Sequence, residues 1–122
     1  MTDLPIYIET IGYVVSCLPE DDPERHSLSI RIERTAPNRW ALRWRGQCLN
    51  FRTQEWEYEH IPSERTERWL ADHRVDELGE AQGVACELAP TLCVGPYDVA
   101  GFLAWREKQQ ATADASSDRR PA

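Results

Sequence analysis

Four cysteines and three histidines are the residues whose types could support nucleophilic or metal chemistry. The cysteines include no C-x-x-C pair, and their separations match no zinc ribbon or zinc finger. A thiol nucleophile needs a base close by, and Cys48 with His60 or His73 is the combination to consider. Because the sequence shows no secretory signal, the simplest interpretation is four reduced thiols buried as small hydrophobic side chains: Cys17, Cys48, Cys86 and Cys93.

No catalytic motif accompanies these residues. The sequence has no glycine-rich phosphate loop, no H-E-x-x-H and no G-x-S-x-G. The acidic pairs Asp21–Asp22 and Asp76–Glu77 are explained by solvation in a loop and by the start of a helix. We therefore expect no catalytic residue, no metal site and no cofactor, and a protein that is not an enzyme.

Charged residues alternate with large rings in two short segments, RWALRWR at 39–45 and EWEYEH at 55–60. Side chains of a strand point alternately to its two faces, so each segment predicts a strand with one charged face and one ring face. If the two strands are neighbours, arginines and glutamates pair across the sheet; if the CLN segment forms a strand between them, they make separate stripes. The charged faces contain the candidate partner-binding residues: Arg39, Arg43, Arg45, Glu55, Glu57 and Glu59.

The ring faces could be a hydrophobic core or a platform on which nucleic-acid bases stack. A platform needs basic groups that follow a phosphate backbone, and the charges beside Trp56 and Tyr58 are glutamates. Burial is favoured, because leucines and isoleucines share the same faces. We predict that Trp40, Trp56 and Trp69 lie in one core.

Strands and helices in a simple order must position these faces. Apolar alternation predicts strands at 5–16, 27–34, 39–45, 46–51 and 55–60, and apolar residues at helical spacing predict helices at 64–74, 77–89 and 99–109. Ser63 and Asp98 are the expected helix caps. Turns of two or three residues permit only antiparallel pairing. The predicted fold class is α+β: a single domain with an antiparallel meander sheet of four to five strands and two or three helices packed on one face.

Chain length predicts one domain. We place it at residues 1–108. Residues 109–122, QQATADASSDRRPA, show no apolar periodicity and are expected to form a disordered tail.

The net charge of −7 argues against a general nucleic-acid binder. Residues 27–53 nevertheless carry six arginines against one glutamate, and five of these arginines define an alternative nucleic-acid-binding stripe: Arg31, Arg39, Arg43, Arg45 and Arg52. No apolar run is long enough to cross a membrane. We expect no membrane association and a location in the cytoplasm of the host cell.

Residues 40–104 resemble a group of small proteins of actinobacterial phages and prophages to which no activity is assigned. The resemblance rests on RWALRWRGQCLN, EWEYE and PSER, and on APTLCVGPYDVAGFLA. His60 stands where the group has proline, and VGPYDV stands where it has an Asn-Gly turn. The resemblance implies a phage or prophage origin, which agrees with 13 arginines against one lysine.

These observations favour a non-catalytic accessory protein that acts by binding a host or phage protein. The alternative is a nucleic-acid-binding module that uses the arginine stripe of residues 31–52. The sequence predicts neither the identity of the partner nor the oligomeric state.

Overall fold

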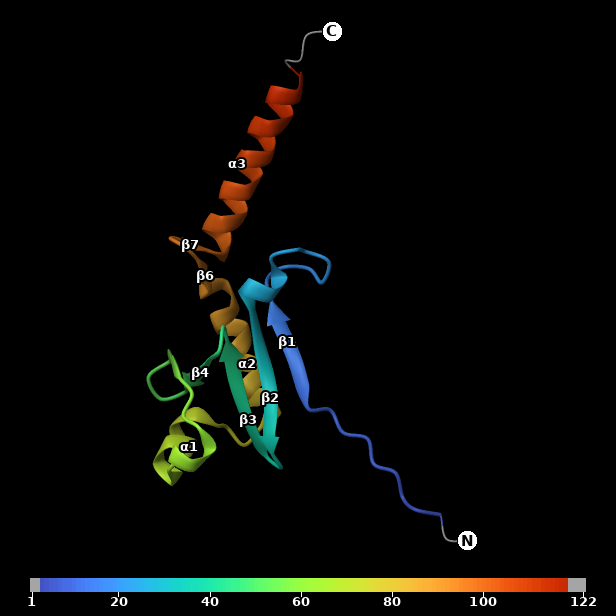
Figure 1. The fold of residues 1–122 in the computed structure, drawn as a ribbon, viewed down its shortest axis with the longest axis vertical. Helices are drawn as coiled ribbons and strands as arrows, with labels where there is room; N and C mark the ends of the chain where they lie inside the picture. The colour runs from blue at the N-terminus through green and yellow to red at the C-terminus, as the bar shows by residue number, and fades with distance from the viewer. Residues whose placement is uncertain (1–2, 119–122) are drawn as a thin grey trace.

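The computed structural model describes residues 3–118. Five antiparallel strands form one sheet in the order β1-β2-β3-β4-β5 (Figure 1). They are β1 (Gly12–Ser16), β2 (Ser29–Ala36), β3 (Arg39–Trp44), β4 (Gln47–Asn50) and β5 (Glu55–Tyr58). The β3–β4 turn consists of Arg45 and Gly46, both with positive φ (50° and 77°), as a two-residue hairpin of matching twist requires. The predicted α+β fold with an antiparallel meander is confirmed.

Three α-helices and a second, two-stranded sheet follow the meander. They are α1 (Glu67–His73), α2 (Leu78–Leu88), the hairpin of β6 (Cys93–Val94) and β7 (Tyr97–Asp98), and α3 (Val99–Asp118). Asp98 accepts a hydrogen bond from the Gly101 N–H and holds the start of α3, as predicted. The expected cap Ser63 lies instead in the 3₁₀ turn Pro62–Glu64. Thr66 caps α1 by accepting a hydrogen bond from the Trp69 N–H at 3.1 Å.

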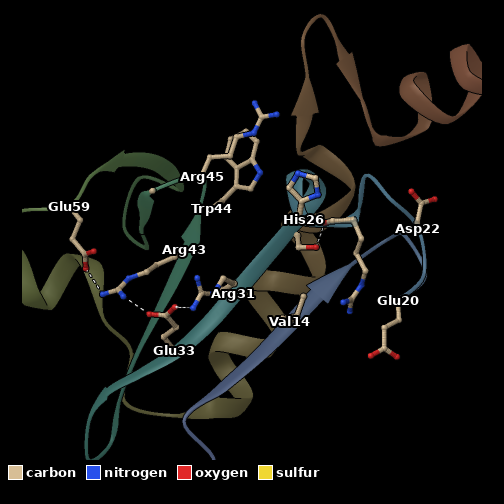
Figure 2. Close-up of a pocket in the computed structure, with 13 residues that line it drawn as sticks. Val14, Glu20, Asp22, His26, Arg31, Glu33, Arg43, Trp44, Arg45 and Glu59 are labelled. Carbon is tan, nitrogen blue, oxygen red and sulfur yellow. Dashed lines mark hydrogen bonds and ion pairs between the residues drawn. The ribbon is translucent and has the colours of Figure 1, made fainter.

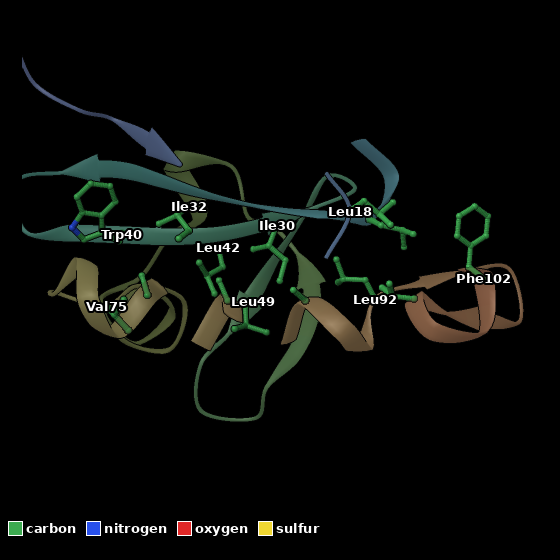
Figure 3. Close-up of a cluster of buried hydrophobic side chains, with 14 residues drawn as sticks. Leu18, Ile30, Ile32, Trp40, Leu42, Leu49, Val75, Leu92 and Phe102 are labelled. Atoms are coloured by element: carbon green, nitrogen blue, oxygen red, sulfur yellow. The ribbon is translucent and has the colours of Figure 1, made fainter. Parts of the chain in front are cut away.

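The hydrophobic core lies between the sheet and α2 (Figures 1 and 3). Ile30, Ile32 and Leu42 of the two central strands are fully buried and meet Ala81 and Ala85 of α2 within the core cluster. The alanines let the helix approach the sheet closely. Val99 and Phe102, at the start of α3, complete the cluster. Two helices therefore contribute to the core on the ring face.

The predicted ring core is correct for Trp40, which is buried in this cluster, and Trp56 packs against it while partly buried. It is wrong for Tyr58, which is 78% exposed because β5 is the last strand of the sheet. It is also wrong for Trp69. This side chain is buried but is not part of the core cluster, because α1 attaches to polar groups from β5.

The first strand is shorter than predicted. β1 begins at Gly12, and residues 3–11, here called the N-terminal arm, continue as irregular chain that leads away from the sheet (Figure 1). The last backbone contact with β2 is from the Arg34 N–H to the Ile11 carbonyl at 2.8 Å. In the β1–β2 register Glu9 falls opposite Ala36, the last residue of β2, so residues 3–8 have no described strand beside them.

The structure differs from the expected tail at residues 109–118, which continue α3 as a helix (Figure 1). Helical hydrogen bonds are local, so α3 continues without tertiary contacts, and the alanines and glutamines of this segment are good helix formers. Residues 109–114 are exposed, so this part of α3 forms without burying side chains. Residues 119–122 of the expected tail lie outside the described residues. No helix within residues 3–118 is long and apolar enough to cross a bilayer.

Candidate functional site

Two of the predicted charged residues, Arg43 and Glu59, belong to a row of ion pairs on the sheet face opposite the core (Figure 2). Arg31 of β2 contacts Glu33 at 2.7 Å, and Arg43 of β3 donates hydrogen bonds to both Glu33 and Glu59. The Arg43–Glu59 distance is 2.7 Å. We call this side of the sheet the charged face. Its row alternates in sign, so each charge has a partner of the opposite sign.

Glu59 is the centre of this network. Besides Arg43, it accepts a hydrogen bond from Arg74 at 3.0 Å and contacts Arg65 at 3.5 Å. Burial raises the pKa of Glu59, but the hydrogen bonds from Arg43 and Arg74 outweigh this and hold the pKa below its ordinary value. Arg74 is itself buried, and its second terminal nitrogen donates to the His73 carbonyl. The carboxylate therefore compensates a guanidinium that has little access to water.

Glu57 attaches α1 to the sheet. Its carboxylate contacts His73 Nε2 at 2.7 Å and accepts a hydrogen bond from the Asn50 amide. These two hydrogen bonds, chiefly that from His73, lower the pKa of Glu57. His73 Nδ1 lies 2.7 Å from the Trp69 carbonyl, so both ring nitrogens face acceptors.

Trp69 is covered by polar planar groups. Its indole stacks on the imidazoles of His73 and His60, and the ring centre of His60 lies 5.2 Å away. The guanidinium of Arg74 lies 5.0 Å from the centre of the indole. Arg65 lies at 5.5 Å. Stacked imidazoles and guanidinium groups bury an indole without placing it in an aliphatic core. Sequence periodicity identifies Trp69 as buried, but it does not distinguish these two environments.

The structure answers whether the arginine and glutamate strands are neighbours. β4 lies between β3 and β5, yet the long Arg43 side chain reaches past it to Glu59. Of the six candidate partner-binding residues, three are engaged within the fold: Arg43, Glu57 and Glu59. Arg39, Arg45 and Glu55 are exposed, and within residues 3–118 they form no ion pair. Arg45 stacks over Trp44 at 5.3 Å.

An open hollow of about 780 Å³ lies on the charged face, between the ion-pair row and the loop that follows β1 (Figure 2). Asp22 of this loop is bound by both terminal nitrogens of Arg106 from α3, at 3.0 and 2.8 Å. Hydrogen bonds from Arg106 lower the pKa of Asp22. Most charges around the hollow are therefore neutralised by other groups of the chain.

The cysteines differ from the expected buried set. Cys48 is buried, whereas Cys17, Cys86 and Cys93 are exposed, and all four are free thiols. Burial raises the pKa of Cys48, which disfavours the nucleophilic thiolate. The two histidines considered as its base, His60 and His73, stack on Trp69 instead. Among residues 3–118, no group of three His, Cys, Asp or Glu side chains is placed to hold a metal ion.

The N-terminal arm is the feature that sequence reasoning missed. Its large apolar side chains are between 61% and 96% exposed: Leu4, Ile6, Tyr7, Ile8 and Ile11. The arm is attached to β2 through Arg34, which donates its backbone N–H to the Ile11 carbonyl and forms an ion pair with Glu9 at 2.6 Å. The strand predicted at residues 5–16 is therefore wrong for residues 5–11, because alternation alone does not supply a neighbouring strand, and none of the described strands lies beside residues 3–8.

No family model, curated protein or solved structure matches this chain.

Proposed function

We propose that the protein is a non-catalytic accessory protein that acts by binding another protein chain through its N-terminal arm. The observation that carries this proposal is the exposure of five large apolar side chains within residues 4–11. Soluble proteins rarely leave a contiguous apolar surface in water unless it binds something. The phage or prophage origin implied by the resemblance is compatible with this role, and the partner is then a host or phage protein.

The chemistry of the arm supports binding by strand pairing. Residues 3–10 of the arm pair with no strand in the described part of the chain, so their N–H and C=O groups are available to another chain. Burying one Leu or Ile side chain contributes about 1.5–3 kcal/mol. Leu4, Ile6 and Ile8 together can therefore offset much of the free-energy cost of association.

The alternative, nucleic-acid binding by the arginine stripe, has less support. Arg31 and Arg43 are held by Glu33, and Arg52 contacts Asp72 at 3.3 Å. An arginine that already has a carboxylate partner gains less from a phosphate. Nucleic-acid binding predicts an affinity that falls steeply with salt, by about 3–5 in log K per decade for five contacts. We expect no such binding by the wild type.

A pair of matched double variants tests the proposed function. Ile6→Asp with Ile8→Asp adds two charges to the arm, whereas Tyr58→Asp with Ile61→Asp adds two charges at exposed apolar positions elsewhere. Each variant is immobilised and used to capture proteins from an actinobacterial lysate, and its self-association is measured by sedimentation. The wild type and the Tyr58/Ile61 variant should bind the same chain, and the arm variant should lose that binding.

Retention of binding by the arm variant would contradict the proposal. So would a wild type that binds no protein chain, its own copies included. Unfolding is not a concern for the arm variant, because the arm lies outside the hydrophobic core.

A further inference from the structure

We infer that the chain bound by the N-terminal arm is a second copy of this protein, paired antiparallel along the outer edge of β1. This inference rests on the proposed function, because it names the partner of the arm. β1 is the first strand of the sheet, and its outer edge has no neighbour among the described strands. Val14, on this strand, is 48% exposed.

The direction of each peptide group along β1 follows from one hydrogen bond. The Arg34 N–H donates to the Ile11 carbonyl, so the peptide groups of Ile11 face β2. In an antiparallel strand, successive residues direct these groups to alternate edges. The peptide groups of Gly12 and Val14 therefore face outward. When the arm pairs as a strand, the same alternation directs the peptide groups of Leu4, Ile6, Ile8 and Thr10 outward as well.

The position of Pro5 agrees with pairing at this edge. Proline has no N–H and interrupts the edge toward which it points. Pro5 falls on the inner side, where β2 has already ended at Ala36. The outer edge from residue 4 to residue 16 thus keeps all its donors and acceptors, and the only proline of the segment lies where no hydrogen bond is needed.

The arm and the edge of β1 are complementary in length and chemistry. β1 has five residues, and arm residues 4–8 match that length. With a twofold axis at Thr10, Ile6 of one copy lies opposite Val14 of the other and covers it on the charged face. On the opposite face, Tyr7 lies opposite Tyr13. Tyr13 packs against Trp40 at 6.1 Å, so Tyr7 extends an existing apolar surface.

Charge and symmetry favour a second copy over a foreign strand. In this register Glu9 lies opposite Ile11, and its own charge is already paired with Arg34. No two acidic residues of the segment face each other directly. A twofold contact also uses both arms and both β1 edges at once, as self-complementary interfaces do. A single foreign strand would cover only one such edge.

Sedimentation of the full chain provides the first measurement. We expect a concentration-dependent dimer with twice the 14.1 kDa mass of the chain. A wild type that stays monomeric at its highest soluble concentration, while its arm still captures another protein, overturns this inference and leaves the proposed function standing. An arm that binds neither a second copy nor another protein overturns both this inference and the proposed function.

Two neighbouring proline substitutions test which edge is used. Ile6→Pro removes an N–H from the outer edge, and Tyr7→Pro removes one from the unused inner side. Because one ladder hydrogen bond is lost from each copy, Ile6→Pro should raise the dimer dissociation constant about ten- to hundredfold. Tyr7→Pro loses the contact with Tyr13 but keeps every N–H of the outer edge, so it should raise the dissociation constant less than Ile6→Pro does. A dimer that tolerates Ile6→Pro, or that both prolines weaken equally, overturns the pairing.

A cysteine placed at the twofold axis tests the register. With Cys17, Cys86 and Cys93 replaced by serine, Thr10→Cys should form a disulfide-linked dimer on mild oxidation, because facing Cα atoms about 5.5 Å apart are within disulfide reach. Thr35→Cys, at an exposed position on the β2–β3 hairpin, serves as the control. On a non-reducing denaturing gel it should show no disulfide-linked dimer. Equal cross-linking of the two variants contradicts the register.

Discussion

The indole of Trp69 stacks on the imidazole of His73, with ring centres 4.2 Å apart and planes at 14°. The far side of this histidine binds Glu57 of β5, so stacking and hydrogen bonding together attach α1 to the sheet. The domain thus has two buried regions of different chemistry. One is an aliphatic core under the ring face, and the other is a polar stack next to the charged face.

Replacement of Trp40 by alanine should destabilise the protein severely. Trp40 is buried in the hydrophobic core cluster, and removal of a core Trp or Phe side chain costs about 3–5 kcal/mol. Trp105→Ala is the matched control, because Trp105 is 43% exposed. Urea unfolding measures both free energies. A Trp40→Ala variant that is no less stable than Trp105→Ala would contradict the assignment of the core.

Replacement of Glu59 by glutamine should destabilise the fold without changing its shape. Arg74 and Arg43 would lose their shared anion, and breaking a buried pair costs about 3–5 kcal/mol, with less expected at this partly exposed site. We therefore expect a loss of about 2–3 kcal/mol. Glu55→Gln removes the same charge from an exposed position and should change stability by less than about 0.5 kcal/mol. Equal effects in chemical unfolding would show that the network does not stabilise the fold.

Stability should fall in acid. Arg106 lowers the pKa of Asp22 and His73 lowers that of Glu57, and Glu59 also has a lowered pKa. A carboxyl whose pKa is depressed in the folded state stabilises the fold above its unfolded pKa, and this contribution is lost as the pH falls through the folded pKa. The melting temperature should therefore be nearly constant from about pH 7 to pH 5 and fall below about pH 4.5.

The variant Asp22→Asn is the control for this pH dependence. It cannot ionise, so its melting temperature should fall less between neutral and acid pH than that of the wild type. A wild type whose melting temperature does not change down to about pH 3 would exclude a role for these carboxylates in stability.

Removal of the distal part of α3 should leave the domain intact. A chain that ends at Gln110 loses helix, and the side chains of residues 111–114, which are removed with it, are exposed. Its melting temperature should stay within about two degrees of the full chain, while its far-ultraviolet circular dichroism at 222 nm should weaken. A large drop in melting temperature would show that this segment stabilises the body.

Local signals predicted the sheet well. The β2–β3 and β3–β4 connections were readable because Pro37, Asn38 and Gly46 favour turns, and alternating residues between turns specify which face each side chain occupies. The same rule places Arg43, Glu57 and Glu59 on the charged face, whereas Arg45 lies in the β3–β4 turn. The contacts of these side chains could not be predicted from the sequence, because the length and direction of a side chain such as Arg43 decide which neighbouring strand it reaches.

Three features were not predicted from the sequence. The environment of Trp69 depends on which face of the sheet α1 approaches, and a helical period carries no such information. Helix formation beyond Gln109 continues the local hydrogen bonds of α3, and the absence of an apolar stripe does not exclude it. The exposure of the arm depends on where β2 ends, more than twenty residues further along the chain.

The sequence by itself determined the antiparallel meander, its two faces and the positions of the helices, because periodicity and turn chemistry act between residues close in the chain. Only the tertiary structure decided that Glu57 and Glu59 are used within the fold, and that the apolar residues of the arm remain in water. Both outcomes depend on contacts between distant segments. The type of a residue determines which interactions its side chain can form, and the three-dimensional arrangement determines whether a partner residue is close enough to form them.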